Sequence, residues 1–436
     1  MTSAIPNITK LPELWSKIKF TLLALVIYRI GAHIATPGVN VEAMADFIET
    51  SAQGTLFGLY DLFAGGGFSR ATVFALGIMP YISASIVFQL AGPVFPIIEK
   101  MQRDEEGKKR LTQWTRYLTV ALCIFQAYGF ALFAETAIPG AVANPGFGFR
   151  ATTVLMLTTG GVFIMWLGEQ ITERGIGNGM SLLIFFSIIE RLWPEILRTV
   201  EALRSGTLTF TKLLVVLAFM TAVVAGTVAV IVAARRIPIQ IPRKVMGRGR
   251  IREGTKTFIP LRINSSGVMP IIFAQSIIIV PGTLASFTNV PWAQEIAQYF
   301  SVTSWLYIVT TTLLIVFFAY FYTSIIFNPV DLAENLKKQG GFIPGVKPGA
   351  ATADYIDDVL SRITLPGALF LAFVAMLPIV VFNVLNMPFQ FGGTALLIVV
   401  GVALDTVQQV QQHMILRQYD GFMKEGRIKF RGRQRF

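Results

Sequence analysis

Charged residues are scarce in this chain of 436 residues. Only 14% of the residues are Asp, Glu, Lys or Arg, whereas 53% are hydrophobic. A soluble domain carries roughly 25% charged residues, so this composition excludes a soluble globular protein and indicates one that crosses a membrane several times. The single cysteine, Cys123, lies in an apolar run, so no disulfide can form within the chain.

Motifs of familiar catalytic sites are absent as well. The sequence contains no HExxH motif, no phosphate-binding P-loop and no paired aspartates within an apolar run. The two histidines, His33 and His413, fall at opposite ends of predicted spans, so they cannot share a metal. The glycine-rich GIGNG at 175–179 begins an apolar run instead of following a strand. We therefore predict a protein that is not an enzyme and holds no metal or cofactor.

Long hydrophobic runs are, by contrast, abundant. A helix needs about 20 apolar residues to cross a hydrocarbon layer, and ten runs nearly free of charge approach this length. The predicted fold is therefore all-α, with ten membrane-spanning helices. The runs cover residues 20–36, 71–92, 117–135, 152–170, 177–193, 210–234, 266–286, 305–327, 363–382 and 393–413.

Basic residues are distributed unevenly between the two sides of these spans. Thirty fall in the segments on the side of the N-terminus and four in the loops on the other side. The positive-inside rule then places both termini in the cytoplasm. Arg191 and Lys212, at span ends, are expected to snorkel to the interface. Arg29 lies deeper and is expected to face the bundle or the outer surface in a structural role.

The ten spans divide into two sets of five with opposite topology. The first span runs outward and the sixth runs inward, and inverted repeats of this kind place a shared site at the midplane between them. We expect an N-terminal half over residues 1–193, an external hinge loop over 194–209, a C-terminal half over 210–414 and a basic tail over 415–436.

The stretch at 54–90 combines a segment too short to span with the second span. Residues 55–64 are apolar, and Gly65, Gly66 and Gly67 free the backbone before the spanning helix. The short segment must be buried inside protein, because lipid-exposed irregular backbone is not tolerated at depth. It is either a movable stopper or a re-entrant turn that only packs, and the residues alone leave both open.

Two cytoplasmic loops, 235–262 and 328–362, are long and rich in proline and glycine. Both are expected to form ordered protrusions. The first carries nine basic residues and one acidic residue, enough to contact nucleic-acid phosphates, anionic headgroups or an acidic protein surface. The positive-inside topology alone could equally account for this charge.

A small-solute carrier and a channel for larger cargo both fit ten spans. Coupled carriers keep ionisable residues within their spans, but the candidates here, Glu169, Glu173 and Asp405, lie near cytoplasmic ends. The central segments offer mainly aliphatic side chains, which bind a small polar solute poorly and can close a pathway by dewetting. The residues therefore favour a channel.

Several long motifs closely resemble the SecY family of protein-conducting channels. They are FALGIMPYISASI at 74–86, WLGEQITERGIGNGMS at 166–181, PLRINSSGVMPIIFAQSI at 260–277, NPVDLAENLKKQGGFIPGVKPG at 328–349 and FGGTALLIVVGVALD at 391–405. The resemblance covers essentially the whole chain. It implies two inverted five-helix halves around a central hourglass pore that also opens sideways into lipid, between spans 2–3 and 7–8. The implied function is passive translocation of unfolded polypeptides across the bacterial cytoplasmic membrane, with lateral release of transmembrane segments into it.

The same resemblance implies three sets of functional residues. The pore ring would consist of Ile78, Ile82, Met180, Ile184, Ile272 and Ile398. The plug, at about residues 55–67, would include Leu56, Phe57, Leu59, Tyr60, Leu62, Phe63, Gly65, Gly66 and Gly67. The cytoplasmic docking surface would include Arg243, Lys244, Arg248, Arg250, Arg252 and Lys347. The spacing of four residues within Ile78/Ile82 and Met180/Ile184 supports the ring, because it places each pair on one helix face.

The partners implied by the resemblance are both proteins and lipids. They are the small membrane subunits SecE and SecG, the SecA motor ATPase, the ribosome, signal sequences, nascent polypeptides and membrane lipids. Lys347 departs from the pattern, because bacterial relatives usually have arginine in this turn. Lysine keeps the charge but loses bidentate hydrogen bonding, which leaves its effect on motor coupling open.

Overall fold

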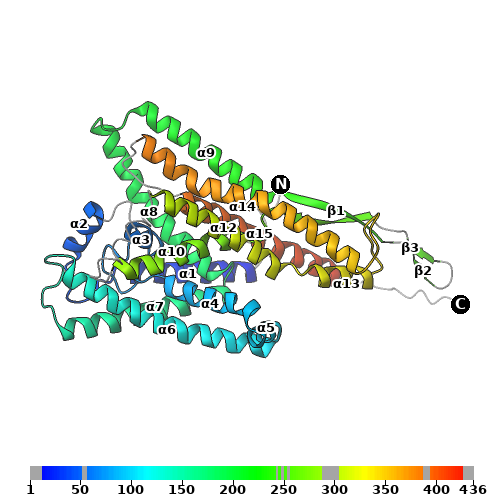
Figure 1. Ribbon diagram of the computed structural model, residues 1–436, viewed down its shortest axis with the longest axis horizontal. Coiled ribbons are helices and arrows are strands. Elements are labelled where there is room, and N and C mark those ends of the chain that lie inside the picture. Colours follow the sequence, from blue (N-terminus) through cyan, green and yellow to red (C-terminus); the bar gives the residue numbers. More distant parts are fainter. Residues whose placement is uncertain are drawn as a thin grey trace.

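The computed structural model describes residues 12–51, 56–241, 244–246, 250–252, 256–286, 304–385 and 393–425. Helices dominate it (Figure 1). The N-terminal half contains α1 (Pro12–Gly31), α2 (Val41–Ser51), α3 (Leu56–Phe63), α4 (Met79–Val94), α5 (Pro96–Arg103), α6 (Glu105–Thr136), α7 (Phe147–Arg174) and α8 (Gly179–Arg204). The C-terminal half contains α9 (Phe210–Val232), α10 (Met269–Ser286), α12 (Trp305–Ile326), α13 (Pro329–Lys338), α14 (Ala350–Leu385) and α15 (Gly393–Glu425).

Each of the ten predicted spans corresponds to a helix in this set. Within the described residues, six helices are each long and apolar enough to cross a membrane, and α4 with α5 would make a seventh across a bend of 109°. The six are α6, α7, α9, α12, α14 and α15. The short helices α4 and α10 contact each other, so protein rather than lipid satisfies part of their surface.

The second span is shorter than predicted, because α4 begins at Met79 and not at residue 71. The intervening backbone turns repeatedly, with φ of 46° at Ala71 and 56° at Gly77. Its polar groups pair with the segment after α1: the Thr36 amide donates to the Ala71 carbonyl at 2.8 Å, and the Val73 amide donates to the Ile34 carbonyl at 2.9 Å. A buried turn with satisfied hydrogen bonds therefore replaces the first part of the expected helix.

The two halves pack mainly within themselves and meet along a few helices. In the N-terminal half α6 contacts α4 and α7, while in the C-terminal half α12 lies between α10 and α14. Across the boundary, α10 contacts α4 and α3, and α15 contacts α8. Buried side chains from both halves form the main hydrophobic core.

The first of the two long loops, 235–262, contains antiparallel strand pairs of a β-hairpin, which the all-α prediction missed. Strand β1 (Ala234–Gln240) pairs antiparallel with β4 (Lys256–Arg262), and β2 (Lys244–Met246) pairs with β3 (Arg250–Arg252). The alternation in IPIQ buries Ile237 and Ile239, as period two in a strand requires. The described residues of this loop therefore form ordered strands, as expected.

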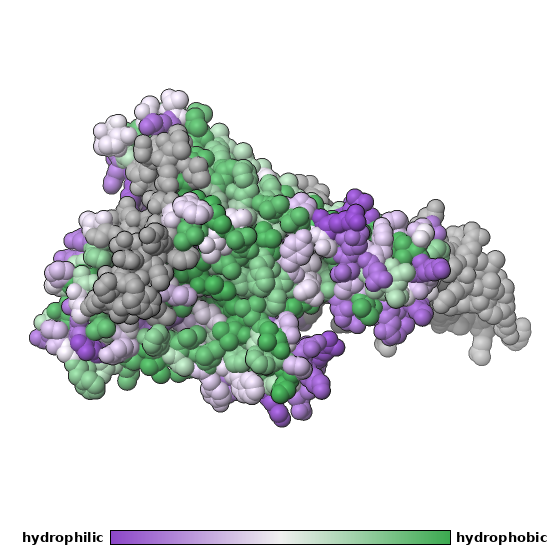
Figure 2. Space-filling view, viewed as in Figure 1, coloured by the Kyte–Doolittle hydropathy of each residue, from purple (hydrophilic) through white to green (hydrophobic). Residues whose placement is uncertain are grey.

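The two long loops share a hydrophobic core that is separate from that of the bundle. Its buried members are Ile237, Ile239, Leu261, Leu336, Ile343, Ile356 and Leu360. A bridge between Gln240 and Phe342 joins the hairpin to the segment after α13. Figure 2 shows hydrophilic surface gathered over this end and over α5, and mostly hydrophobic surface over the bundle.

The expected external loop at 194–209 is largely helical. Helix α8 continues through Pro194 as far as Arg204, so only residues 205–209 connect it to α9. Pro194 lies inside α8 without ending the helix. The division of the chain into two halves around this connection stays a proposal.

Candidate functional site

A cavity of about 280 Å³ lies where α4, α8 and α10 meet, and aliphatic side chains from all three helices line it. Ile82 comes from α4, Met180 and Ile184 from α8, and Ile272 from α10. Four of the six residues predicted for the pore ring therefore converge on one space, although they are nearly 200 positions apart in the sequence. Such a collar can exclude water and ions while remaining adaptable in shape.

The other two predicted ring residues, Ile78 and Ile398, are buried but do not line this cavity. Their exposed fractions are 3% and 0%, and both belong to the core shared by the two halves. Ile78 is the residue before α4, and its carbonyl accepts the first hydrogen bond of that helix from the Ile82 amide at 3.2 Å. Both lie in the same core as the collar, and their role in the ring remains a prediction.

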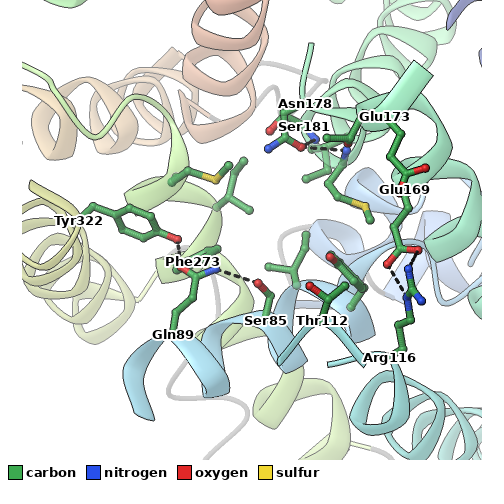
Figure 3. Close-up of a pocket in the computed structure, with 17 residues that line it drawn as sticks. Ser85, Gln89, Thr112, Arg116, Glu169, Glu173, Asn178, Ser181, Phe273 and Tyr322 are labelled. Atoms are coloured by element: carbon green, nitrogen blue, oxygen red, sulfur yellow. Dashed lines mark hydrogen bonds and ion pairs between the residues drawn. The ribbon is translucent and has the colours of Figure 1, made fainter. Parts of the chain in front are cut away.

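One wall of the cavity is polar and rigid (Figure 3). The Arg116 guanidinium on α6 donates to both carboxylate oxygens of Glu169 on α7, at 3.0 and 2.9 Å, a bidentate geometry that adds strength and orientation. Asn178 caps α8, because its side-chain oxygen accepts from the Met180 amide at 3.1 Å. This cap fixes the start of α8, and Met180 in the first turn of the helix lines the cavity.

The opposite wall is a hydrogen-bonded contact between α4 and α12. The Tyr322 hydroxyl donates to the Gln89 side-chain oxygen, and Gln89 in turn donates to the Ser85 hydroxyl at 2.8 Å. Figure 3 shows Tyr322 and Gln89 pointing toward one another across this seam, on the far side of the cavity from Arg116. Since α4 and α12 belong to different halves, this bond joins the halves beside the cavity.

The predicted plug segment is buried against α8 and α10. Helix α3 contacts both of these helices, and Leu56, Leu59, Leu62 and Phe63 are buried. Tyr60 is buried too, and its hydroxyl donates to the Leu76 carbonyl at 3.0 Å. Phe57 is half-buried and stacks on neighbouring aromatic rings. The segment is therefore enclosed by protein, as its length and composition predicted.

The three glycines after α3 each have a structural reason. Gly65 and Gly66 adopt φ of 64° and 75°, a region that favours glycine. At Gly67 a Cβ would lie 3.0 Å from both the Ala64 carbonyl oxygen and the Thr72 hydroxyl. The glycines thus allow a tight reversal that returns the chain toward α4.

An ionic cluster beside α3 was missed by the sequence reasoning. Asp61 is 0% exposed in the middle of this apolar helix and forms an ion pair with Arg191 on α8. Its other oxygen accepts from the Ser69 amide at 2.8 Å. Arg191 therefore does not snorkel to the interface, because a buried carboxylate is a better partner than lipid headgroups. The signal in the sequence was a lone aspartate within an apolar segment.

Glu190, the neighbour of Arg191, holds two more arginines. It pairs with Arg29 of α1 and, at 2.9 Å, with Arg70 after the plug glycines. Arg29 therefore has the structural role expected of it. Arg70 also donates to the carbonyls of Gly65 and Gly66, both at 3.0 Å. Burial lowers the pKa of Arg70, opposed by the charge of Asp61.

This cluster corrects one argument of the sequence analysis. Ionisable residues were expected only near cytoplasmic ends of spans, yet Glu190 lies midway along α8 and Asp61 inside the bundle. Each carboxylate is paired with an arginine. Carboxylates that are already occupied by arginines are suited to holding elements together rather than to carrying a coupling ion.

The predicted docking residues fall partly outside the described residues, as Arg243 and Arg248 do. Lys244 lies opposite Arg252 in the β2–β3 pair, and Arg250 lies opposite Met246. Lys347 is exposed in the turn before α14, and its carbonyl accepts from the Thr352 hydroxyl at 2.8 Å. The hairpin and this turn belong to the same protrusion through the shared core.

Comparison with known proteins gives matches over nearly the whole chain. The SecY family model matches residues 72–407. "Protein translocase subunit SecY" of Escherichia coli strain K12 is 44% identical over 97% of each chain. The relative of the same name from Thermus thermophilus is 43% identical over 99% of this chain and 100% of its own. That from Aquifex aeolicus is 42% identical over 97% of this chain and 100% of its own.

Solved structures show the same fold at lower sequence identity. "The structure of a protein conducting channel" matches with a TM-score of 0.67 and 18% identity, covering 98% of this chain and 100% of the other. "Sec61 in the Canine ribosome-channel complex from the endoplasmic reticulum" matches with a TM-score of 0.63, 18% identity and the same coverage. This ten-helix architecture is therefore that of known protein-conducting channels.

Proposed function

Because this chain belongs to the SecY family, we propose that it forms the channel of a protein translocase, a multi-pass membrane protein that conducts unfolded polypeptides. The observation that carries the mechanism is the convergence of Ile82, Met180, Ile184 and Ile272 on one cavity between the halves. A collar of flexible aliphatic side chains fits many translocating side chains without binding any tightly, as conduction requires.

The mechanism is passive, and its elements act in sequence. An apolar signal sequence prefers lipid and enters at the seam where Gln89 on α4 meets Tyr322 on α12. The halves then separate, α3 leaves its position as plug, and the ring, including Ile78 and Ile398, widens around the extended chain. The driving energy comes from a partner. Transmembrane segments leave sideways through the same seam.

The cytoplasmic protrusion is the surface on which that partner docks. The basic hairpin, with Arg243, Lys244, Arg248, Arg250 and Arg252, together with Lys347, would contact ribosomal RNA or an acidic surface of the SecA motor. The names of the structural neighbours include a ribosome–channel complex, which supports the ribosome as one partner. Small subunits such as SecE and SecG would pack on the lipid-facing helices.

The proposed location is the bacterial cytoplasmic membrane, with both termini in the cytoplasm. The strong excess of basic residues on one side of the spans supports this orientation. It places the hairpin and the turn with Lys347 inside, where ribosome and motor are found, and the cluster around Glu190 on the outer side of the collar.

Ion leak through the purified, reconstituted complex tests the pore ring. We expect Ile78→Gly with Ile82→Gly to raise conductance well above background while protein export continues, because Ile82 lines the cavity and Ile78, buried one turn before it, is predicted to belong to the same ring. The matched control is Ile86→Gly, which removes a buried isoleucine from the same helix but not from the cavity. Background conductance in the double variant, or equal leak in the control, would show that the ring is assigned wrongly.

A further inference from the structure

The ionic cluster beside α3 fastens the plug to one particular helix. We propose that the Asp61–Arg191 ion pair, backed by Arg70 and Glu190, is a latch that holds the plug against α8 and must be released before the channel opens. The inference rests on the proposed role of α3 as plug. The latch assigns a positioning role to charged residues that belong neither to the apolar face of the plug nor to the pore ring.

The burial of Asp61 is the first argument. A carboxylate with 0% exposure is strongly disfavoured unless it is paired and hydrogen-bonded. Here it has both an arginine partner and the Ser69 amide. The charge is therefore compatible with this position of α3 only while Arg191 faces it, so the pair specifies where the plug sits.

The second argument is that Glu190 and Arg191 are adjacent on α8 and hold two parts of the plug segment, α3 itself and the glycine turn that follows it. Arg191 pairs with Asp61 within α3, and Glu190 pairs with Arg70, which also donates to the carbonyls of the glycine turn. Moving the plug away from α8 therefore breaks both attachments together. Hydrophobic packing alone has no such directional preference.

The two members of the latch differ in solvent exposure, so substitutions at the two positions should have effects of different size. The Arg191 side chain is 28% exposed, whereas that of Asp61 is 0% exposed. Removing Arg191 leaves a fully buried charge without its partner, and displacement of the plug would relieve it. Removing Asp61 leaves an arginine that water can reach, so its effect is smaller.

Thiol labelling of the resting channel tests the latch. The reporter is Ala64→Cys, at a position 0% exposed at the end of the plug, in a Cys123→Ala background. The full translocase complex is reconstituted in vesicles, and a membrane-impermeant maleimide is added from outside. We expect Arg191→Gln to speed labelling at least about tenfold, which corresponds to about 1.4 kcal/mol in plug position.

Further variants make the result specific. Asp61→Asn should speed labelling less than Arg191→Gln, and the double variant should lie below Arg191→Gln alone, because the buried charge is gone. Arg191→Lys, which keeps the charge, should stay near the parent. Arg198→Gln is the matched control, since Arg198 pairs with Glu195 at 3.4 Å further along the same helix, and it should label at the parental rate.

If the reporter cysteine in Arg191→Gln reacts at the parental rate, the latch proposal is wrong. It is also wrong if the reporter reacts faster in the double variant than in Arg191→Gln. If Arg191→Gln does not assemble, Asp61→Asn against Arg198→Gln decides in the same way, since equal rates reject the proposal. The assay needs no translocating substrate, so it is independent of the conductance test. If the ring variant shows only background conductance while Arg191→Gln still speeds labelling, the pore assignment is rejected and the latch proposal is retained.

Discussion

At the scale of single residues, close backbone approach sets the geometry of the collar. Gly179 begins α8 directly before Met180, and a Cβ at this position would lie 2.0 Å from the Gly168 carbonyl oxygen on α7. Only glycine therefore allows α7 and α8 to approach this closely. The sequence showed GIGNG as a break before a span, but it could not show which helix the glycines face.

Gly179→Ala should therefore destabilise the bundle by about 1–3 kcal/mol, because the added methyl must push two backbones apart. Thermal unfolding of the purified complex in detergent measures the effect. Gly148→Ala in α7 is the control, since a Cβ there meets nothing within 4 Å and alanine favours the helix. Equal thermal unfolding midpoints for the two variants would contradict the close approach of α7 and α8 at Gly179.

At the scale of elements, the seam between α4 and α12 shows what helix prediction leaves out. Both helices were predicted, and the resemblance implied an opening beside them. The bond between Tyr322 and Gln89 depends on the rotation of each helix about its axis, which hydropathy does not specify. The hairpin was missed for a related reason, because seven-residue strands in a basic loop give little signal beside ten apolar runs.

Tyr322→Phe should make the seam easier to open, because it removes one hydrogen bond worth about 1 kcal/mol. We expect export of a reporter with a shortened apolar signal core to rise about fivefold. Tyr320→Phe on the same helix is the control, since its hydroxyl donates to the Ser361 carbonyl at 3.2 Å within the C-terminal half. If the reporter is exported equally well by both variants, the hydrogen bond between Tyr322 and Gln89 does not control opening.

At the scale of the whole molecule, the proposed docking surface has a hydrophobic core of its own. The core of the protrusion, around Ile237 and Ile356, is separate from the main core of the bundle. Changes on the hairpin surface should therefore leave the bundle folded. This separation was not visible in the sequence, where the two loops are about 90 residues apart and share only their length and their proline and glycine content.

Charge reversal at Arg243, Arg248 and Arg250 should weaken binding of ribosome and motor at least about tenfold, and should flatten the salt dependence of binding. The thermal midpoint of the bundle should not change. Reversal at Arg198 and Arg204, which lie on the predicted outer side, is the control. Unchanged affinity of both partners for the hairpin variant would remove the docking surface from the proposal.

The sequence by itself determined the membrane class, the apolar runs that form the ten helices and the burial of the segment at 56–67, because hydropathy and glycine act locally along the chain. Tertiary structure decided which residues meet. Asp61 and Arg191 are separated by 130 positions, and nothing in their local context favours one partner over another. The same holds for Ile82, Ile184 and Ile272: their convergence on one cavity follows from how three helices rotate and cross, which the packing of the whole bundle sets.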